Sequence, residues 1–158
     1  KTIQYATKVL SNSNIDNRIK SDAQIMIARS AIKTKDENRA EKAYSEVLKI
    51  ATGDLAAEAL YYDAYFKNKA QNYEASNASV QKLAKDYAGY KEWSAKGLII
   101  MAKNFYALGD AFQATYILDS VIANFGDFPE IVAQAKQESS IIKAKEAQSN
   151  SSINPEGN

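Results

Sequence analysis

Two amphipathic patterns separated by one short turn occupy the residues from Ala95 to Phe125, and this feature constrains the fold most. Apolar residues recur at helical spacing before the turn and again after it. The turn is Leu108-Gly109-Asp110, in which Gly can adopt the left-handed conformation that ends a helix and Asp can cap the next one. Neither helix can bury its apolar stripe alone, so this pair needs further helix pairs beside it.

The same pattern occurs three times in phase, in units that start near Ser21, Ala57 and Ala95, at spacings of 36 and then 38 residues. Each unit has a small residue in its first helix, a polar cap at the turn, a small residue in its second helix, and large residues four and seven places later. In the order of the units these residues are Ala28, Ala64, Ala102; Asp36, Asn72, Asp110; Ala40, Ser76, Ala114; Tyr44, Val80, Leu118; and Val47, Leu83, Val121. The pattern predicts an all-α repeat fold.

With these residues the chain resembles the tetratricopeptide repeat family, whose unit of about 34 residues is a helix–turn–helix with small residues at fixed contacts. The resemblance implies a right-handed α-solenoid of antiparallel helix pairs, with about seven or eight helices in all. The second unit departs from the family's pattern, because Asp63 and Lys67 occupy places that are usually apolar. We therefore expect its first helix to be rotated, with Tyr62 and Phe66 facing inward.

We predict one superhelical domain over residues 1–146 and a disordered tail over residues 147–158. Asp16 is the expected cap of the first full unit, and a capping box at Ser21 is the alternative. Residues 1–11 look like the second helix of a pair whose first helix is missing, which favours the carboxyl-terminal part of a longer repeat protein. The predicted boundaries are a partial repeat at 1–15, repeats at about 16–53, 54–89 and 90–127, and a capping helix at 128–146 that turns polar after Ile142.

The composition excludes several classes of function. Lys and Arg number 20 against 19 Asp and Glu, so no bulk charge favours binding to nucleic acid or to an anionic membrane. The chain has no His and no Cys, which removes imidazole bases, thiolate nucleophiles and most transition-metal ligands. Its six glycines form neither a dinucleotide-binding nor a phosphate-binding motif, and no apolar run approaches the ~18 residues of a membrane-spanning helix. We predict no cofactor, no metal and no transmembrane segment.

The family resemblance places a partner-binding surface on the concave groove formed by the first helices of the units. Carried over by register, the groove positions include Ile25 and Ile99. For the tyrosines of the groove, Tyr61, Tyr65 and Tyr106, a second possibility is that they only fill space between repeats. The family's carboxylate clamp requires Lys and Asn at set groove positions, and only Lys96 agrees, so we predict no clamp. The residues that we predict to contact a partner are Arg29, Tyr61, Tyr65, Asn68, Lys69, Lys96, Lys103 and Tyr106.

Three functions remain open. The leading hypothesis is a non-enzymatic scaffold that binds a protein or peptide along the concave face. The alternative is a carbohydrate- or peptidoglycan-acting enzyme of the cell envelope, or its accessory subunit, which would need two carboxylates facing each other within about 10 Å. The third is weak self-association through the amino-terminal edge, where Tyr5, Val9 and Leu10 cannot all pack on one stripe. A similarity to long Asn-, Lys- and Tyr-rich bacterial repeat proteins favours a cell-envelope location, on the periplasmic side.

Overall fold

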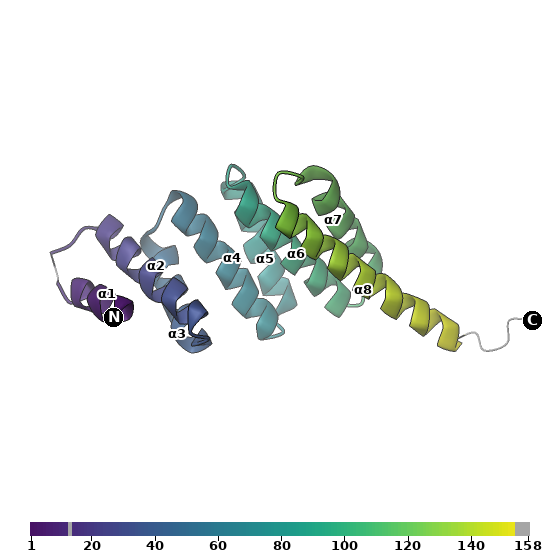
Figure 1. Ribbon diagram of the computed structural model, residues 1–158, viewed down its shortest axis with the longest axis horizontal. Helices are drawn as coiled ribbons and strands as arrows, with labels where there is room; N and C mark the ends of the chain where they lie inside the picture. The colour runs from purple at the N-terminus through teal and green to yellow at the C-terminus, as the bar shows by residue number, and fades with distance from the viewer. Residues whose placement is uncertain (13, 154–158) are drawn as a thin grey trace, which may run out of the picture.

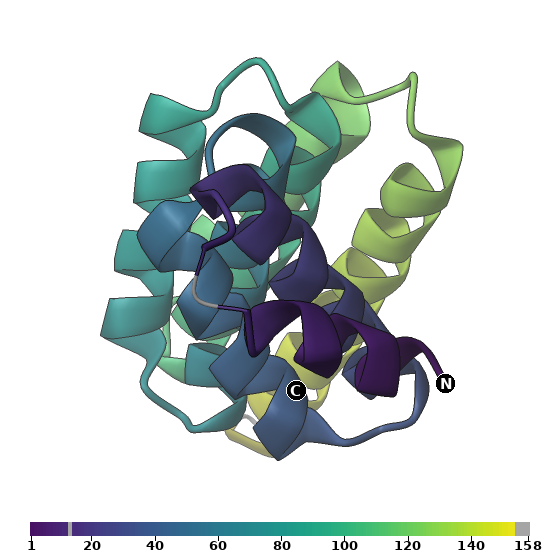
Figure 2. The ribbon, with the colours of Figure 1, turned by 90° about the vertical axis from the view of Figure 1, so that its left-hand side faces the viewer.

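The computed structural model describes residues 1–12 and 14–153, and within these ranges the chain forms eight α-helices and no strand. The helices follow one another in chain order along the long axis of the molecule, with α1 and the end of α8 at opposite ends (Figure 1). Seen along that axis, the helices overlie one another (Figure 2). The predicted all-α fold is thereby confirmed. The helices are α1 (Thr2–Leu10), α2 (Asn17–Lys33), α3 (Glu37–Ile50), α4 (Gly53–Lys69), α5 (Tyr73–Asp86), α6 (Lys91–Ala107), α7 (Ala111–Asn124) and α8 (Pro129–Ile153).

Three helix pairs of equal dimensions form the centre of the molecule. The first helices α2, α4 and α6 are each 17 residues long, and the second helices α3, α5 and α7 are each 14 residues long. The most extensive helix–helix contacts among the described residues are those within the pairs α2–α3, α4–α5 and α6–α7. Neighbouring pairs meet through α3–α4, α5–α6 and α4–α6, while α1 and α8 cover the two ends of the stack by packing on α2 and α7.

The turn inside each pair has the same backbone geometry. Lys35, Gln71 and Gly109 occupy its left-handed position, with φ angles of 58°, 60° and 88°. The amide that follows each of them donates a hydrogen bond five residues back, which for the first turn joins Asp36 to the carbonyl of Ala31. This pattern satisfies carbonyls at the helix end that would otherwise lack partners. The sequence predicted the left-handed conformation only at Gly109, because Lys35 and Gln71 are not residue types that favour it.

Small residues allow the two helices of each pair to approach closely. All six of the small positions predicted from the repeat are fully buried, and so are the six large positions that follow them in the second helices. In the middle pair the contact is direct, since Ser76 Oγ donates a 2.7 Å hydrogen bond to the backbone carbonyl of Ala64. Between pairs, a Cβ added to Gly97 would lie 3.2 Å from Leu83 and 3.3 Å from Val80, so α6 also approaches α5 closely.

In the second unit, aromatic side chains face inward next to the positions where the sequence departs from the repeat pattern. Phe66 is buried, and Tyr62 is half-buried with its ring stacked at 4.1 Å on that of Tyr44. Asp63 and Lys67, which replace apolar residues, form an ion pair with each other. The expectation that Tyr62 and Phe66 face inward is therefore confirmed.

The last helix ends later than predicted. The helix predicted at 128–146 is α8, which continues to Ile153, so residues 147–153 of the predicted disordered tail are helical and residues 154–158 lie outside the described part. A helix that is already formed gains one backbone hydrogen bond for each added residue, so it can continue beyond its apolar stripe. No helix in the described part of the chain combines the length and hydropathy required to cross a bilayer.

The caps also differ in part from the predicted ones. Asp16, Asp36 and Asp110 each accept a hydrogen bond from the backbone three residues later, as expected of caps. Asn72 stands at the start of α5 but makes no side-chain capping bond. Ser21 lies inside α2 and is buried, so the alternative capping box at that residue is wrong.

The left-handed turn position yields a test of the repeat. Replacing Lys35 or Gln71 with Gly should stabilise the protein by ~0.5–1 kcal/mol, because Gly adopts this backbone conformation without the steric cost that other residues incur. Gly109→Ala should destabilise it by ~1 kcal/mol through the backbone alone, since no atom lies within 4 Å of the added Cβ. Urea denaturation of the three variants measures these changes. A loss of stability in both Gly variants would contradict the shared geometry.

Candidate partner-binding site

The eight residues predicted to contact a partner lie on the first helices α2, α4 and α6, and three of them, Arg29, Tyr65 and Lys103, occupy the same position in the three pairs. We call the surface that they define the first-helix face. Two further predicted groove positions, Ile25 and Ile99, are buried and pack in the core, so they are not available to a partner and that part of the prediction is wrong. The physical reason is that these two side chains point between neighbouring helices, where apolar groups are most stable away from water.

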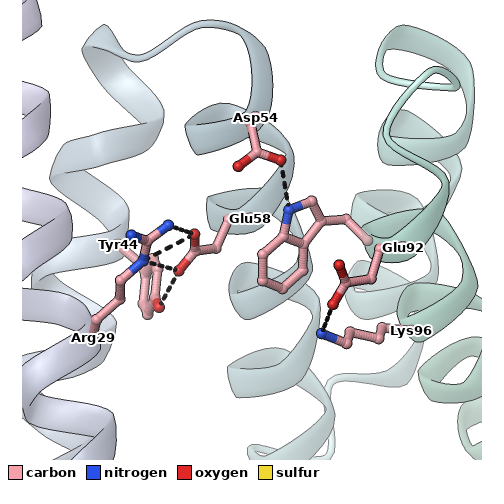
Figure 3. Close-up of polar contacts among 7 residues, drawn as sticks. Arg29, Tyr44, Asp54, Glu58, Glu92 and Lys96 are labelled. Atoms are coloured by element: carbon pink, nitrogen blue, oxygen red, sulfur yellow. Dashed lines mark hydrogen bonds and ion pairs between the residues drawn. The ribbon is translucent and has the colours of Figure 1, made fainter. Parts of the chain in front are cut away.

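Arg29 is held by a carboxylate from the next unit. Its guanidinium donates two hydrogen bonds from Nε, at 3.0 and 3.2 Å, and a further one from Nη2 to the carboxylate of Glu58 in α4 (Figure 3). Tyr44 of α3 donates a 2.9 Å hydrogen bond to the same carboxylate. The side chain of Glu58 is 3% exposed and that of Arg29 is 50% exposed. The network therefore joins the first two units and leaves one side of the guanidinium open to water.

The electrostatics of this network follow from its geometry. The hydrogen bond to Glu58 raises the pKa of Arg29 further above its usual value. Burial, and then the negative charge of Glu58, raise the pKa of Tyr44, so the phenol remains a hydrogen-bond donor. Arg29 and Tyr44 thus both stay protonated, and their charge-assisted hydrogen bonds hold the Glu58 carboxylate in its buried position.

Trp93 forms a second connection, between α6 and α4. Its indole nitrogen donates a 2.9 Å hydrogen bond to Asp54 in the first turn of α4, and its ring lies 5.5 Å from that of Tyr61. Lys96 lies 4.5 Å from the centre of the indole ring and also pairs with Glu92 (Figure 3). Burial raises the pKa of Tyr61 to about 12. Tyr61 therefore acts mainly as packing between the second and third units.

Asn68 belongs to a buried polar cluster. Its side-chain amide donates a 2.7 Å hydrogen bond to Asn104 of α6, which is fully buried. Asn104 in turn donates to Ser76 at 2.9 Å and to Asn77 at 2.8 Å, both in α5. Three helices are joined by these bonds, and Asn68 has little freedom to contact a partner. The sequence pattern did not indicate this cluster, because Asn104 occupies a position that is not polar in every unit.

The remaining residues of the first-helix face are more accessible. Lys69 is exposed and pairs with Glu37 of α3, and this hydrogen bond raises its pKa. Lys103 is exposed and pairs with Glu138 of α8 at 3.2 Å. The half-buried ring of Tyr65 lies beside the first of these lysines, with its centre 5.7 Å from Lys69 Nζ. All four cations predicted for this surface thus have carboxylate partners.

Tyr106 lies near the carboxyl-terminal end of α6. Lys145 Nζ of α8 approaches its ring to 5.8 Å. Partial desolvation, and then the negative charge of Glu146, raise the pKa of Tyr106. Tyr106 and Lys103 therefore form the part of the first-helix face closest to α8.

Exposed apolar side chains also occur elsewhere. Phe112 and Tyr116, one helical turn apart on α7, are 79% and 64% exposed, which sequence inspection did not anticipate. At the amino-terminal end, Tyr5 and Val9 of α1 are 70% and 39% exposed. Their exposure agrees with the expected bare apolar surface, and self-association through this edge stays a prediction. In the described residues no group of three or more acidic side chains is placed to hold a metal ion.

Comparison of the chain with models of known protein families and with curated proteins finds no match. The resemblance to tetratricopeptide repeats therefore remains an interpretation of the repeat pattern.

The Arg29–Glu58–Tyr44 network leads to a stability prediction. Arg29→Met should destabilise the protein by about 2–3 kcal/mol, because it leaves a buried carboxylate without its cation. The expected loss of stability is smaller than the loss on breaking a fully buried ion pair, because the Arg29 side chain is half exposed. Arg39→Met removes a similar cation, which pairs with Asp36 at 3.5 Å on the surface, and should cost less than ~1 kcal/mol.

Thermal and urea unfolding of both variants provide the measurement. Equal losses in Arg29→Met and Arg39→Met would show that the network does not hold the first two units together.

Proposed function

We propose that the chain is a non-enzymatic scaffold that binds a protein or peptide partner on the first-helix face. The observation that carries the proposal is the repetition of this face on three successive helices of equal length. A surface that repeats along a stack can follow an extended segment or a helix of a partner over several contacts. Lys103 is exposed and Tyr65 and Tyr106 are half-buried, so part of each of these three side chains is accessible to a partner.

The charges of this face indicate the chemistry of the partner. Each cation of the face already has a carboxylate partner, so a strongly acidic segment would have to break existing ion pairs. Aromatic rings with polar tips favour a partner that offers apolar side chains and hydrogen-bonding groups. We therefore infer a partner segment without high net charge.

The enzymatic alternative has no specific observation in its favour. Glu41 and Asp63 line one small hollow of about 130 Å³, which brings two carboxylates together. In that hollow Asp63 is engaged by Lys67 and Ser79. A pair that hydrolyses glycosides needs one carboxyl group free to donate a proton and the other free to act as base or nucleophile.

A comparison of two double variants tests the proposal. A partner is first captured with the whole chain and identified, and its affinity is then measured by titration. Lys103→Glu with Tyr106→Ala should weaken binding about tenfold or more, because it removes the most accessible contacts of the first-helix face. Phe112→Ala with Tyr116→Ala, which changes the exposed apolar residues of α7, is the matched control and should leave the affinity unchanged.

The opposite result would refute the assignment of the surface. If only the α7 variant loses affinity, the partner binds on α7. If neither variant changes it, the first-helix face is not a binding surface.

A further inference from the structure

The second unit contains three polar residues where the other units have apolar ones. Asp63, Lys67 and Ser79 correspond by repeat spacing to three apolar residues in each neighbouring unit. We call these three residues the polar trio. Their counterparts are Ile27, Ala31 and Ala43 in the first unit and Met101, Phe105 and Ile117 in the third, of which all but the half-buried Phe105 are buried.

The polar trio is connected by hydrogen bonds across the α4–α5 contact. Lys67 Nζ donates to Asp63 Oδ2 at 2.6 Å and to Ser79 Oγ at 2.9 Å. Ser79 Oγ also donates to Asp63 Oδ2. This leaves Asp63 Oδ1 and the third ammonium hydrogen of Lys67 without a bond among the described residues. The side chains of Lys67 and Asp63 remain 37% and 28% exposed.

These groups line a hollow on the side of α4 opposite the first-helix face, since Asp63 and Lys67 lie two residues from Tyr61 and Tyr65 along the helix. The hollow has a volume of about 430 Å³, within the range of small-molecule sites. We call it the second-helix hollow because it opens between α3 and α5. Its lining is Leu48, Leu60, Asp63, Lys67, Ala78, Ser79, Lys82 and Tyr87.

The charge of the second-helix hollow is positive. Asp63 balances Lys67, and Lys82 adds a further positive charge at the edge. Lys82 is exposed and has no hydrogen-bond or ion-pair partner among the described residues, unlike the cations of the first-helix face. Leu48, Leu60 and Tyr87 provide an apolar wall beside it. The hollow thus offers a free cation next to apolar surface.

Stability alone does not account for the polar trio. A partly buried ion pair gains little over well-packed apolar residues of similar volume, because removing the charges from water offsets their attraction. The first and third units show that the fold accepts apolar residues at these positions. A charged cluster that lines a hollow is therefore better explained by a ligand.

We propose that the second-helix hollow binds a small amphipathic carboxylate, with the carboxylate on Lys82 and the free hydrogen of Lys67, and an apolar group against Leu48, Leu60 and Tyr87. This chemistry is shared by a free N-acylated amino acid and by the last residue of a peptide chain. The site lies apart from the first-helix face and does not depend on the scaffold function.

Titration of the ¹⁵N-labelled protein with N-acetyl-leucine, followed by NMR, tests the ligand chemistry. N-acetyl-leucinamide, in which an uncharged amide replaces the carboxylate, should bind about tenfold more weakly or worse, because a charge-assisted hydrogen bond is lost. The peptide acetyl-Gly-Gly-Leu distinguishes the two sources. Tighter binding than that of N-acetyl-leucine assigns the site to a chain terminus, and equal or weaker binding assigns it to the free acid. Equal affinity for acid and amide, or no binding of either, overturns the proposal.

Two variants on α5 locate the binding. Lys82→Gln should weaken N-acetyl-leucine binding about tenfold, because it removes the unpaired cation. Lys85→Gln changes an exposed lysine of the same helix that does not line the hollow, and should leave the affinity unchanged. Equal effects of the two variants would show nonspecific attraction to positive charge and would overturn the proposal.

A swap of the polar trio separates binding from stability. The triple variant Asp63→Ile, Lys67→Ala and Ser79→Ala replaces the polar trio with the apolar residue types found at the same positions of the first unit. We expect a melting temperature equal to or above that of the unchanged protein, together with loss of N-acetyl-leucine binding. A lower melting temperature would show that the trio serves the fold, and unchanged binding would exclude it from the site; either result overturns the proposal.

Discussion

The structure depends on the close approach of the two helices in each pair. Residues no larger than Ala or Ser occupy the contact positions, and all are fully buried. The hydrogen bond from Ser76 to the carbonyl of Ala64 shows how near the two backbones come in the middle pair. Because protein interiors are packed as densely as organic crystals, a longer side chain at such a position would force the helices apart. The same approach lets Val47, Leu83 and Val121 fill the core of their units.

Polar links between units then fix how one pair sits on the next. The first two units are joined by the bonds of Glu58 to Arg29 and Tyr44, and the second and third by the buried amide of Asn104. Buried polar groups are stable only when their hydrogen bonds are made, so each link specifies one arrangement of neighbouring pairs. One consequence concerns binding. Three cations of the first-helix face, Arg29, Lys69 and Lys103, form ion pairs between different helices and so help to hold the stack together, whereas Lys82 of the second-helix hollow has no such role.

Much of the fold was predictable from the sequence, and much of the site was not. Repeat spacing identified the small and large core positions, because burial at helical contacts imposes a regular pattern of size. It also located the departure at Asp63 and Lys67. It could not show that Ser79 completes that cluster, or that Glu58 reaches Arg29, because rotamers and distances between helices decide which polar groups meet. The predicted end of the last helix failed because polar residues can continue a helix without an apolar stripe.

A substitution in the third pair tests the packing of the stack most directly. Ala102 is fully buried in α6, and Ala107 is exposed at the end of the same helix. Urea denaturation should show that Ala102→Leu costs ~1–3 kcal/mol through overpacking, while Ala107→Leu changes stability by less than ~0.5 kcal/mol. Unchanged stability in the Ala102→Leu protein would mean that the helices do not meet at this residue, and would contradict the repeat register on which the whole structure is built.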